Sequence, residues 1–145
     1  MCENLIIEAD GAARGNGSGP ASAAFVVYKN GEIVSKGGKF LGKDGITNNV
    51  AEYHSLILAL EYLIELKADT NVFSDSTVSV RMDSQLVVSQ VTGKWKINNA
   101  RLLELSNRAK ELMSKLSSSV DISWIPREQN KMADRLANEI LQREV

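Results

Sequence analysis

The residues of this 145-residue chain that could do chemistry are mainly carboxylates. Asp10 and Asp83 each end a run of residues typical of a strand, whereas Glu52 and Asp134 lie in segments with helical spacing. Each acid also has a structural interpretation: Asp10 could form an Asp-Gly turn, and Asp83 could cap a helix. Glu52 could complete a capping box with Asn49, and Asp134 could be a solvated helical residue. In combination, the four acids favour a shared site.

A shared site of four carboxylates would need a counter-ion, because like charges in contact repel each other. Mg²⁺ prefers oxygen ligands in octahedral geometry, and two such ions about 4 Å apart form the clamp used for in-line phosphoryl transfer. The chain has one histidine, His54, and one cysteine, Cys2. Because these residues are too few for a cysteine cage or a histidine-rich zinc site, the pattern predicts Mg²⁺ or Mn²⁺, with two ions in one site.

The elements that must position these acids follow from the residue periodicity. Asn30-Gly31 is a strong hairpin signal between two strand-like runs. Strands are expected over residues 4–10, 22–28, 32–41, 77–82 and 120–125, and helices over residues 48–67, 84–91, 98–116 and 128–141. This order predicts an α/β fold in which helices flank a five-stranded mixed sheet, a three-strand antiparallel meander followed by alternating α and β elements. Ligands of such sheets gather at the C-terminal ends of the strands.

The composition is that of one globular domain over residues 1–145, with 43% hydrophobic and 24% charged residues. No apolar run reaches the roughly 18–20 residues of a membrane span, and the N-terminus resembles neither a signal peptide nor a transit peptide. We therefore expect a cytoplasmic protein without membrane contact. The net charge of −1 favours a monomer and gives no global sign of nucleic-acid binding. No protein partner is indicated.

Four segments resemble the motifs of type 1 ribonuclease H, in that family's order and over nearly the whole chain. They are Asp10-Gly-Ala-Ala, Thr47-Asn-Asn-Val-Ala-Glu52-Tyr, Asp83-Ser-Gln-Leu-Val and Asn130-Lys-Met-Ala-Asp134-Arg-Leu-Ala-Asn. The resemblance implies the ribonuclease H-like fold. It also implies hydrolysis of the RNA strand of RNA/DNA hybrids with Mg²⁺ or Mn²⁺, leaving 5′-phosphate and 3′-hydroxyl ends.

The same resemblance implies a role for each acid. Asp10, Glu52, Asp83 and Asp134 match the family's four metal-binding catalytic residues. Asp10 would bridge both ions, and Glu52 would hold one ion beside a 2′-hydroxyl of the RNA. Asp83 and Asp134 would complete the two coordination shells.

Substrate contacts are implied by the resemblance as well. Thr47 and Asn49 would contact the DNA strand together with Asn48, and Gln85 matches a reader of the minor groove. The backbone around Ala13 to Gly15 would contact RNA 2′-hydroxyls, which distinguish RNA from DNA. Substrate binding is expected of Gly11, Ala12, Ala13, Arg14 and Gly15.

The chain departs from many members of the family in the loop before the last helix, where it has no histidine. Arg127 in this loop could attract a phosphate, or it could be an ordinary solvated cation. The stretch around Trp95 is too short for a basic protrusion, yet Trp95 between Lys94 and Lys96 could stack on a duplex or pack against a helix. We expect Trp124 to belong to the core.

Two other functions fit parts of the pattern. The fold could serve as a non-catalytic duplex-binding domain, although all four acids are present. Transposases, integrases and exonucleases share such a fold, but their acids occur in other sequence contexts and the Thr47-Asn-Asn pattern fits them poorly.

Overall fold

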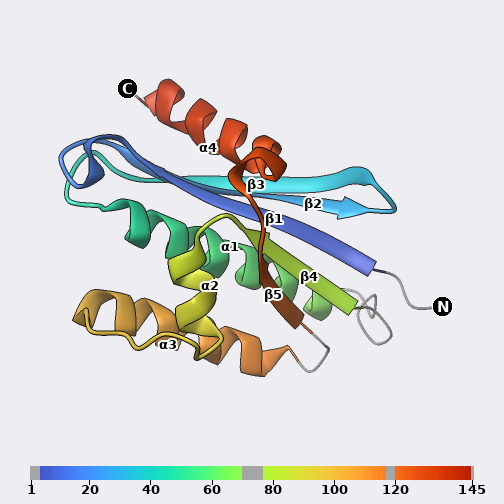
Figure 1. Ribbon diagram of the computed structural model, residues 1–145. Coiled ribbons are helices and arrows are strands. Elements are labelled where there is room, and N and C mark those ends of the chain that lie inside the picture. Colours follow the sequence, from blue (N-terminus) through green and yellow to red (C-terminus); the bar gives the residue numbers. More distant parts are fainter. Residues whose placement is uncertain (1–3, 70–76, 117–119, 145) are drawn as a thin grey trace.

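The computed structural model describes residues 4–69, 77–116 and 120–144 (Figure 1). One sheet and four α-helices account for most of these residues. The strands are β1 (Asn4–Ala13), β2 (Ala21–Lys29), β3 (Glu32–Gly42), β4 (Thr77–Met82) and β5 (Val120–Trp124). The helices are α1 (Asn48–Asp69), α2 (Gln85–Val91), α3 (Ala100–Lys115) and α4 (Lys131–Glu144), with 3₁₀ turns η1 (Arg14–Asn16) and η3 (Arg127–Gln129).

The sheet is mixed, with the strand order β3-β2-β1-β4-β5. Strands β1, β2 and β3 form an antiparallel meander, whereas β4 pairs in parallel with both β1 and β5. The turn between β2 and β3 lies at Asn30 and Gly31, both with positive φ angles of 54° and 80°, as the hairpin signal predicted. The predicted fold class, a five-stranded mixed sheet flanked by helices, is confirmed.

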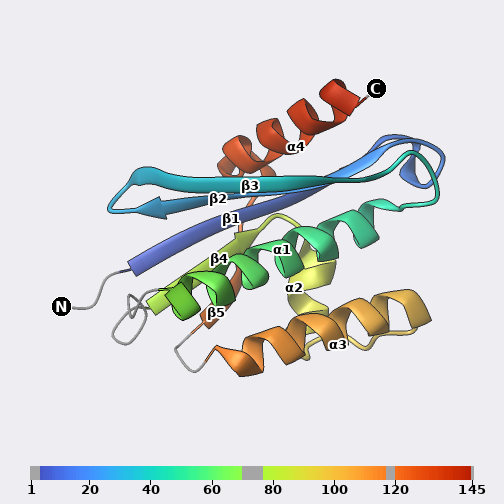
Figure 2. The ribbon, with the colours of Figure 1, turned by 180° about the vertical axis from the view of Figure 1, so that it is seen from behind.

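Helices cover the two faces of the sheet unequally. Helix α1 packs on one face with α3 on its outer side, and α4 lies across the opposite face (Figures 1 and 2). The α1 face holds the main core, in which large side chains such as Ile7, Leu56 and Leu60 are fully buried. The α4 face has a small cluster of Ala24, Ala137 and Ile140. The α1 face of the sheet is therefore the more extensively packed one. Helix α4 covers the other face through the smaller cluster.

Two element boundaries and the burial of one residue differ from the expectation near the site. Strand β1 does not end at Asp10, because antiparallel pairing with β2 continues as far as Ala13 opposite Ala21. Helix α4 begins at Lys131 rather than near residue 128, since η3 occupies the preceding residues. Trp124 is not a core residue: it is 49% exposed, and its indole Nε1 donates a hydrogen bond to the carbonyl oxygen of Asp83.

Within the described residues, none of the helices combines the length and apolar character that crossing a membrane requires.

Candidate active site

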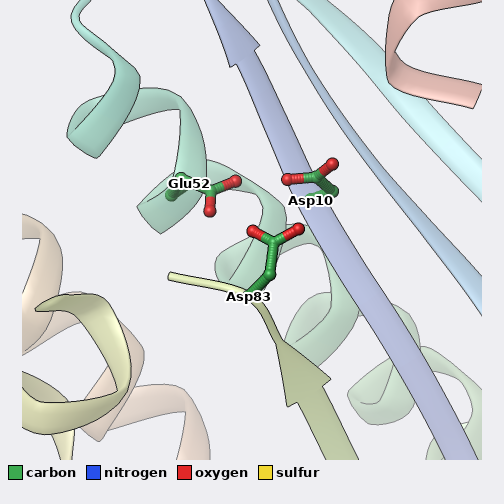
Figure 3. Close-up of side chains that lie close together, drawn as sticks. All are labelled: Asp10, Glu52 and Asp83. Carbon is green, nitrogen blue, oxygen red and sulfur yellow. The ribbon is translucent and has the colours of Figure 1, made fainter. Parts of the chain in front are cut away.

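Three carboxylates from separate elements converge at one edge of the parallel part of the sheet (Figure 3). Asp10 lies in β1, Glu52 lies in the second turn of α1, and Asp83 follows the last residue of β4. Each supplies an oxygen within 4.8 Å of the oxygens of the other two. Asp10 and Glu52 are only 5% and 7% exposed, so two of the three charges are removed from water.

The register of the parallel strands explains why Asp10 and Asp83 meet. Ala9 of β1 pairs with Met82 of β4, and the two acids are the next residues along these strands. Because parallel strands run in the same direction, the residues that follow a matched pair emerge at the same edge. The strands thus place two carboxylates side by side before any helix contributes.

Glu52 reaches this edge because Gly11 has no side chain, so that α1 can approach β1 closely at this position. The Gly11 N–H donates a hydrogen bond to Glu52 Oε1. A Cβ atom at position 11 would collide with the backbone of Ala51 and Glu52. Only glycine allows α1 to approach β1 so closely, and the third carboxylate depends on this contact.

Other residues perform the capping roles that Glu52 and Asp83 could have had. Thr47 Oγ1 accepts a hydrogen bond of 3.3 Å from Val50 N at the start of α1. Ser84 Oγ accepts one of 3.2 Å from Val87 N at the start of α2. The capping-box interpretation of Glu52 and the N-cap interpretation of Asp83 are therefore wrong, and both carboxylates are available to the site.

Asp134 lines the same cavity, which has a volume of about 460 Å³, from the first turn of α4. Its side chain is 34% exposed and lies 3.9 Å from Arg127 Nη2. Asn138 Nδ2 donates hydrogen bonds to the Asp134 carbonyl at 2.9 Å and to its Oδ1 at 3.2 Å. The fourth acid faces the others but is more accessible to water.

The crowding of these acids changes their protonation. Burial raises the pKa of Asp10 to about 7; a hydrogen bond from Glu52 opposes the shift, and repulsion by Asp83 and Asp134 adds to it. Burial also raises the pKa of Glu52 well above its ordinary value, and the charge of Asp10 raises it further. Without a cation, this site holds protons that isolated carboxyls would have released at neutral pH.

This donor set fits hard divalent cations. Oxygen ligands of concentrated negative charge, without sulfur or imidazole, suit Mg²⁺ and Mn²⁺. Among the described residues, Asp134 is the acid of the cavity that makes an ion pair. Its partner across this long contact is Arg127, whose side chain is 81% exposed. The buried pair Asp10 and Glu52 is therefore the part of the site with the greatest need for a cation.

The structure places the predicted substrate-contact residues in two groups. The first group lines the cavity: Gly11, Ala12, Ala13, Arg14, Asn48, Asn49 and Arg127. The second group lies outside its lining: Gly15 in η1, Thr47 at the cap of α1, Gln85 on the exposed start of α2, and Trp95, which is 45% exposed. Both the packing of Trp95 against a helix and its contact with a duplex stay predictions.

Asn130 is a residue of the site that the sequence did not indicate, although it is the first residue of the fourth motif. Asn130 is fully buried between the acids, and its amide nitrogen donates to Asp83 Oδ2 at 3.3 Å. The available signal was an asparagine four residues before Asp134, at the point where a helix begins. Asn138 was missed in the same way, one turn after Asp134.

Comparison with known proteins gives the family. The chain matches the model of the reverse transcriptase-like family over residues 8–140. LC11-RNase H1, isolated from compost and solved in complex with an RNA/DNA hybrid, superimposes with a TM-score of 0.87 at 35% identity, over 97% of this chain and 98% of that one. The chain belongs to the type 1 ribonuclease H family.

Two longer members of the ribonuclease H group are similar in sequence. Ribonuclease HI of Halobacterium salinarum is 41% identical over 133 residues, which are 91% of this chain and 61% of that protein. The bifunctional protein Rv2228c of Mycobacterium tuberculosis is 38% identical over 139 residues, or 94% of this chain. The chain spans only 35% of the length of that mycobacterial relative.

Two connecting segments differ from the pattern that the resemblance implies. The connection between α2 and α3 covers only residues 92–99, which leaves no room for a basic protrusion. The segment before α4 carries Arg127 and no histidine. These are the two departures that the motifs predicted.

Proposed function

We propose that this chain is a divalent-metal-dependent endoribonuclease that hydrolyses the RNA strand of RNA/DNA hybrids. The observation that carries the proposal is the cluster of Asp10, Glu52 and Asp83 within 4.8 Å, with Asp134 lining the same open cavity. The similarity to a ribonuclease H1 solved with an RNA/DNA hybrid supports the choice of substrate. The products would carry 5′-phosphate and 3′-hydroxyl ends.

Asp10, Glu52, Asp83 and Asp134 would hold Mg²⁺ or Mn²⁺, two ions when substrate is bound. When present, such ions neutralise the carboxylates, activate water for in-line attack on phosphorus and stabilise the departing 3′-oxygen. Asp10 is almost fully buried and has an oxygen within 4.8 Å of oxygens of both Glu52 and Asp83, which supports the proposal that it would be a ligand of both ions. In the overall reaction, one water adds to phosphorus and the bond from phosphorus to the 3′-oxygen breaks.

The chain's own groups would bind and orient the duplex around these acids. The segment Gly11–Arg14 and the start of α1 at Asn48 and Asn49 both line the cavity. Asn16 Oδ1 accepts a hydrogen bond of 2.9 Å from Asn48 N, which ties the two segments together. We propose that Gly11–Gly15 contact the RNA 2′-hydroxyls and that Thr47, Asn48 and Asn49 contact the DNA strand. Such hydroxyl contacts would give the preference for RNA in the scissile strand.

Three outlying side chains would extend this interface. Gln85 stands at the exposed start of α2, two residues after Asp83, where it could reach the minor groove. Trp95 offers an exposed ring between Lys94 and Lys96 for contact with the duplex backbone. Arg127 lines the cavity and would attract a phosphate. These contacts would set affinity rather than the chemical step.

Cleavage of an end-labelled RNA/DNA hybrid tests the proposal directly. Reactions with Mg²⁺, Mn²⁺ or chelator would be compared, with single-stranded RNA and duplex DNA as substrate controls. We expect metal-dependent cuts confined to the RNA of the hybrid. Asp83→Asn should strongly reduce them, whereas Asp121→Asn, the same change on the exposed side of β5, should not. Hybrid binding without cleavage by either metal would instead support a non-catalytic duplex-binding domain.

We further infer that residues 1–145 form one domain, which acts as a monomer in the cytoplasm. The near-balanced net charge of −1 and the single sheet with one main core support this inference. Sedimentation velocity would test the monomer, with a concentration-dependent second species as the contrary result.

A further inference from the structure

Asn130 is the one fully buried amide beside the acids among the described residues. It stands between η3 and α4, where the chain enters the helix that carries Asp134. Asn130 is neither a lining residue of the cavity nor a member of the acidic cluster. Its position between three elements makes it a candidate for organising the site.

The contacts of Asn130 reach two of the four acids, Asp83 and Asp134, and the residue before a third. Its Nδ2 donates hydrogen bonds to the carbonyl of Ala9, the residue before Asp10, at 3.0 Å and to Asp83 Oδ2 at 3.3 Å. Its backbone carbonyl accepts a hydrogen bond of 3.1 Å from Asp134 N. One residue therefore links β1, the end of β4 and the first turn of α4 at the level of the carboxylates.

The chemistry of these contacts requires a nitrogen donor. Ala9 O and Asp83 Oδ2 are both acceptors, so the atom between them must donate to both. An amide nitrogen has two hydrogens and can do so without adding charge to a site that already repels itself. The other amide atom, Oδ1, is buried without a hydrogen-bond partner among the described residues. Such an orphaned acceptor is unfavourable for folding, which argues that the amide is retained for its nitrogen.

Asp83 is held at a second point as well. The Trp124 indole donates to its backbone carbonyl at 3.2 Å, while Asn130 holds one oxygen of its carboxylate. The backbone contact fixes where the residue lies, and the side-chain contact fixes which way its carboxylate turns. With Oδ2 restrained, the carboxylate keeps a single orientation relative to Asp10 and Glu52.

We propose that Asn130 is a positioning residue that fixes the Asp83 carboxylate and thereby sets the affinity of the site for divalent cations. The inference rests on the proposed function only in taking the acidic cluster as the metal site. Outer partners that orient metal ligands are worth about 10–100-fold in metal affinity in other proteins. The amide acts through Asp83, so its loss should weaken metal binding without removing a ligand.

Metal titration by calorimetry, without nucleic acid, tests this role. Asn130→Leu keeps the branched shape but removes the donor, and Asn107→Leu makes the same change on the exposed side of α3 as a control. We expect the Kd for Mn²⁺ to rise about tenfold or more in Asn130→Leu and to stay unchanged in Asn107→Leu. In cleavage assays at saturating metal, the KM for the hybrid should not change.

A second pair of variants keeps the test decisive if Asn130→Leu does not fold. Asn130→Ser and Asn130→Ala have nearly the same size and differ by one hydroxyl donor. The serine variant should bind Mn²⁺ more tightly than the alanine variant. Equal affinities in this pair, or a wild-type Kd in a folded Asn130→Leu with a lowered Tm, would overturn the inference and leave Asn130 a purely structural residue.

The two proposals fail in different ways. Wild-type protein that binds Mn²⁺ but does not cleave hybrids would contradict the proposed function and leave the role of Asn130 standing on the calorimetry. Wild-type cleavage with unaltered metal affinity in folded Asn130 variants would contradict only the present inference. Wild-type protein that binds no metal would overturn both.

Discussion

The two sides of the cavity hold their acids under different conditions. On the side of β1 and α1, Asp10 and Glu52 are almost fully buried, and they lie against the main core of the molecule. On the α4 side, Asp134 is partly exposed and faces the solvent-exposed guanidinium of Arg127 across a long contact of 3.9 Å. The helix beneath Asp134 packs on the sheet through the small cluster of Ala24, Ala137 and Ile140.

This difference in burial implies different roles for the two sides of the cavity. Buried charges cannot be screened by water, so Asp10 and Glu52 must bind either protons or cations. The exposed pair is screened, and such pairs contribute little to stability. We therefore assign the strong requirement for metal to the β1 and α1 side and finer effects on affinity to the α4 side.

Replacing Asp10 should give the largest effect. Asp10→Asn removes the central carboxylate, and we expect cleavage to fall on the order of 10³-fold, in the range found for loss of a key electrostatic group. In chelator at pH 8 the same variant should melt at a higher temperature than the wild type, because a buried repulsive charge has been removed. Asp121→Asn serves as the exposed control, with neither effect. A variant with full activity, or one destabilised in chelator, would contradict the contrast between the two sides.

The stability of the metal-free protein should depend on pH through the same residue. The pKa of Asp10 is raised from its usual 3.8 to about 7, so folding favours its protonated form. Its stabilising contribution is complete below about pH 4 and is lost as the pH rises through about 7. As the pH rises from about 4 through about 7, the Tm of the wild type should therefore decrease relative to that of Asp10→Asn. Differential scanning calorimetry in chelator measures this change. If the Tm values of the two proteins changed with pH in parallel, Asp10 would not be the group whose ionisation destabilises the metal-free protein.

Asp134→Asn should have a smaller effect than Asp10→Asn. The side chain is partly solvated and keeps a polar oxygen after substitution, so we expect a loss of activity of about tenfold, with partial recovery at high metal concentration. Its Tm in chelator should be near that of the wild type. A loss as large as that of Asp10→Asn would show that exposure does not distinguish the two sides.

Arg127→Ala should have the smallest effect. Because its guanidinium is exposed, we expect no change in Tm and a few-fold rise in KM for the hybrid. If it contacts a phosphate, the slope of log affinity against log salt should decrease by about one. Arg127→Lys, which keeps the charge, should retain the slope. A change in kcat with an unaltered salt slope would assign Arg127 to the chemical step.

Much of the fold followed from local patterns. The Asn30-Gly31 turn gave the hairpin correctly. The strand expected over residues 77–82 is β4, with Val78, Val80 and Met82 on its buried face. The end of β1 was not predictable, since Gly11 reads as a turn residue until its pairing with Ala23 and its contact with α1 are known. Trp124 was expected in the core because a large aromatic residue in a strand usually packs there, whereas here it stands at the exposed end of an edge strand.

The site was more predictable in its acids than in what holds them. Motif order indicated Asp10, Glu52, Asp83 and Asp134, and the structure brings three of them together with the fourth on the same cavity. Asn130 escaped notice because burial and hydrogen bonding, not residue type, give it importance. Its partners Ala9 and Asp83 lie 121 and 47 residues away along the chain, a distance that no local pattern spans.

We expect the buried acidic cluster to exchange protons for divalent cations. Calorimetric titration of Mn²⁺ into the protein at about pH 6, in buffers of differing ionisation enthalpy, tests it most directly. Because the pKa of Asp10 is raised to about 7, metal binding should release protons, and the observed enthalpy should vary with the buffer. The variation should be reduced in Asp10→Asn. Metal binding whose enthalpy is the same in every buffer would contradict the claim.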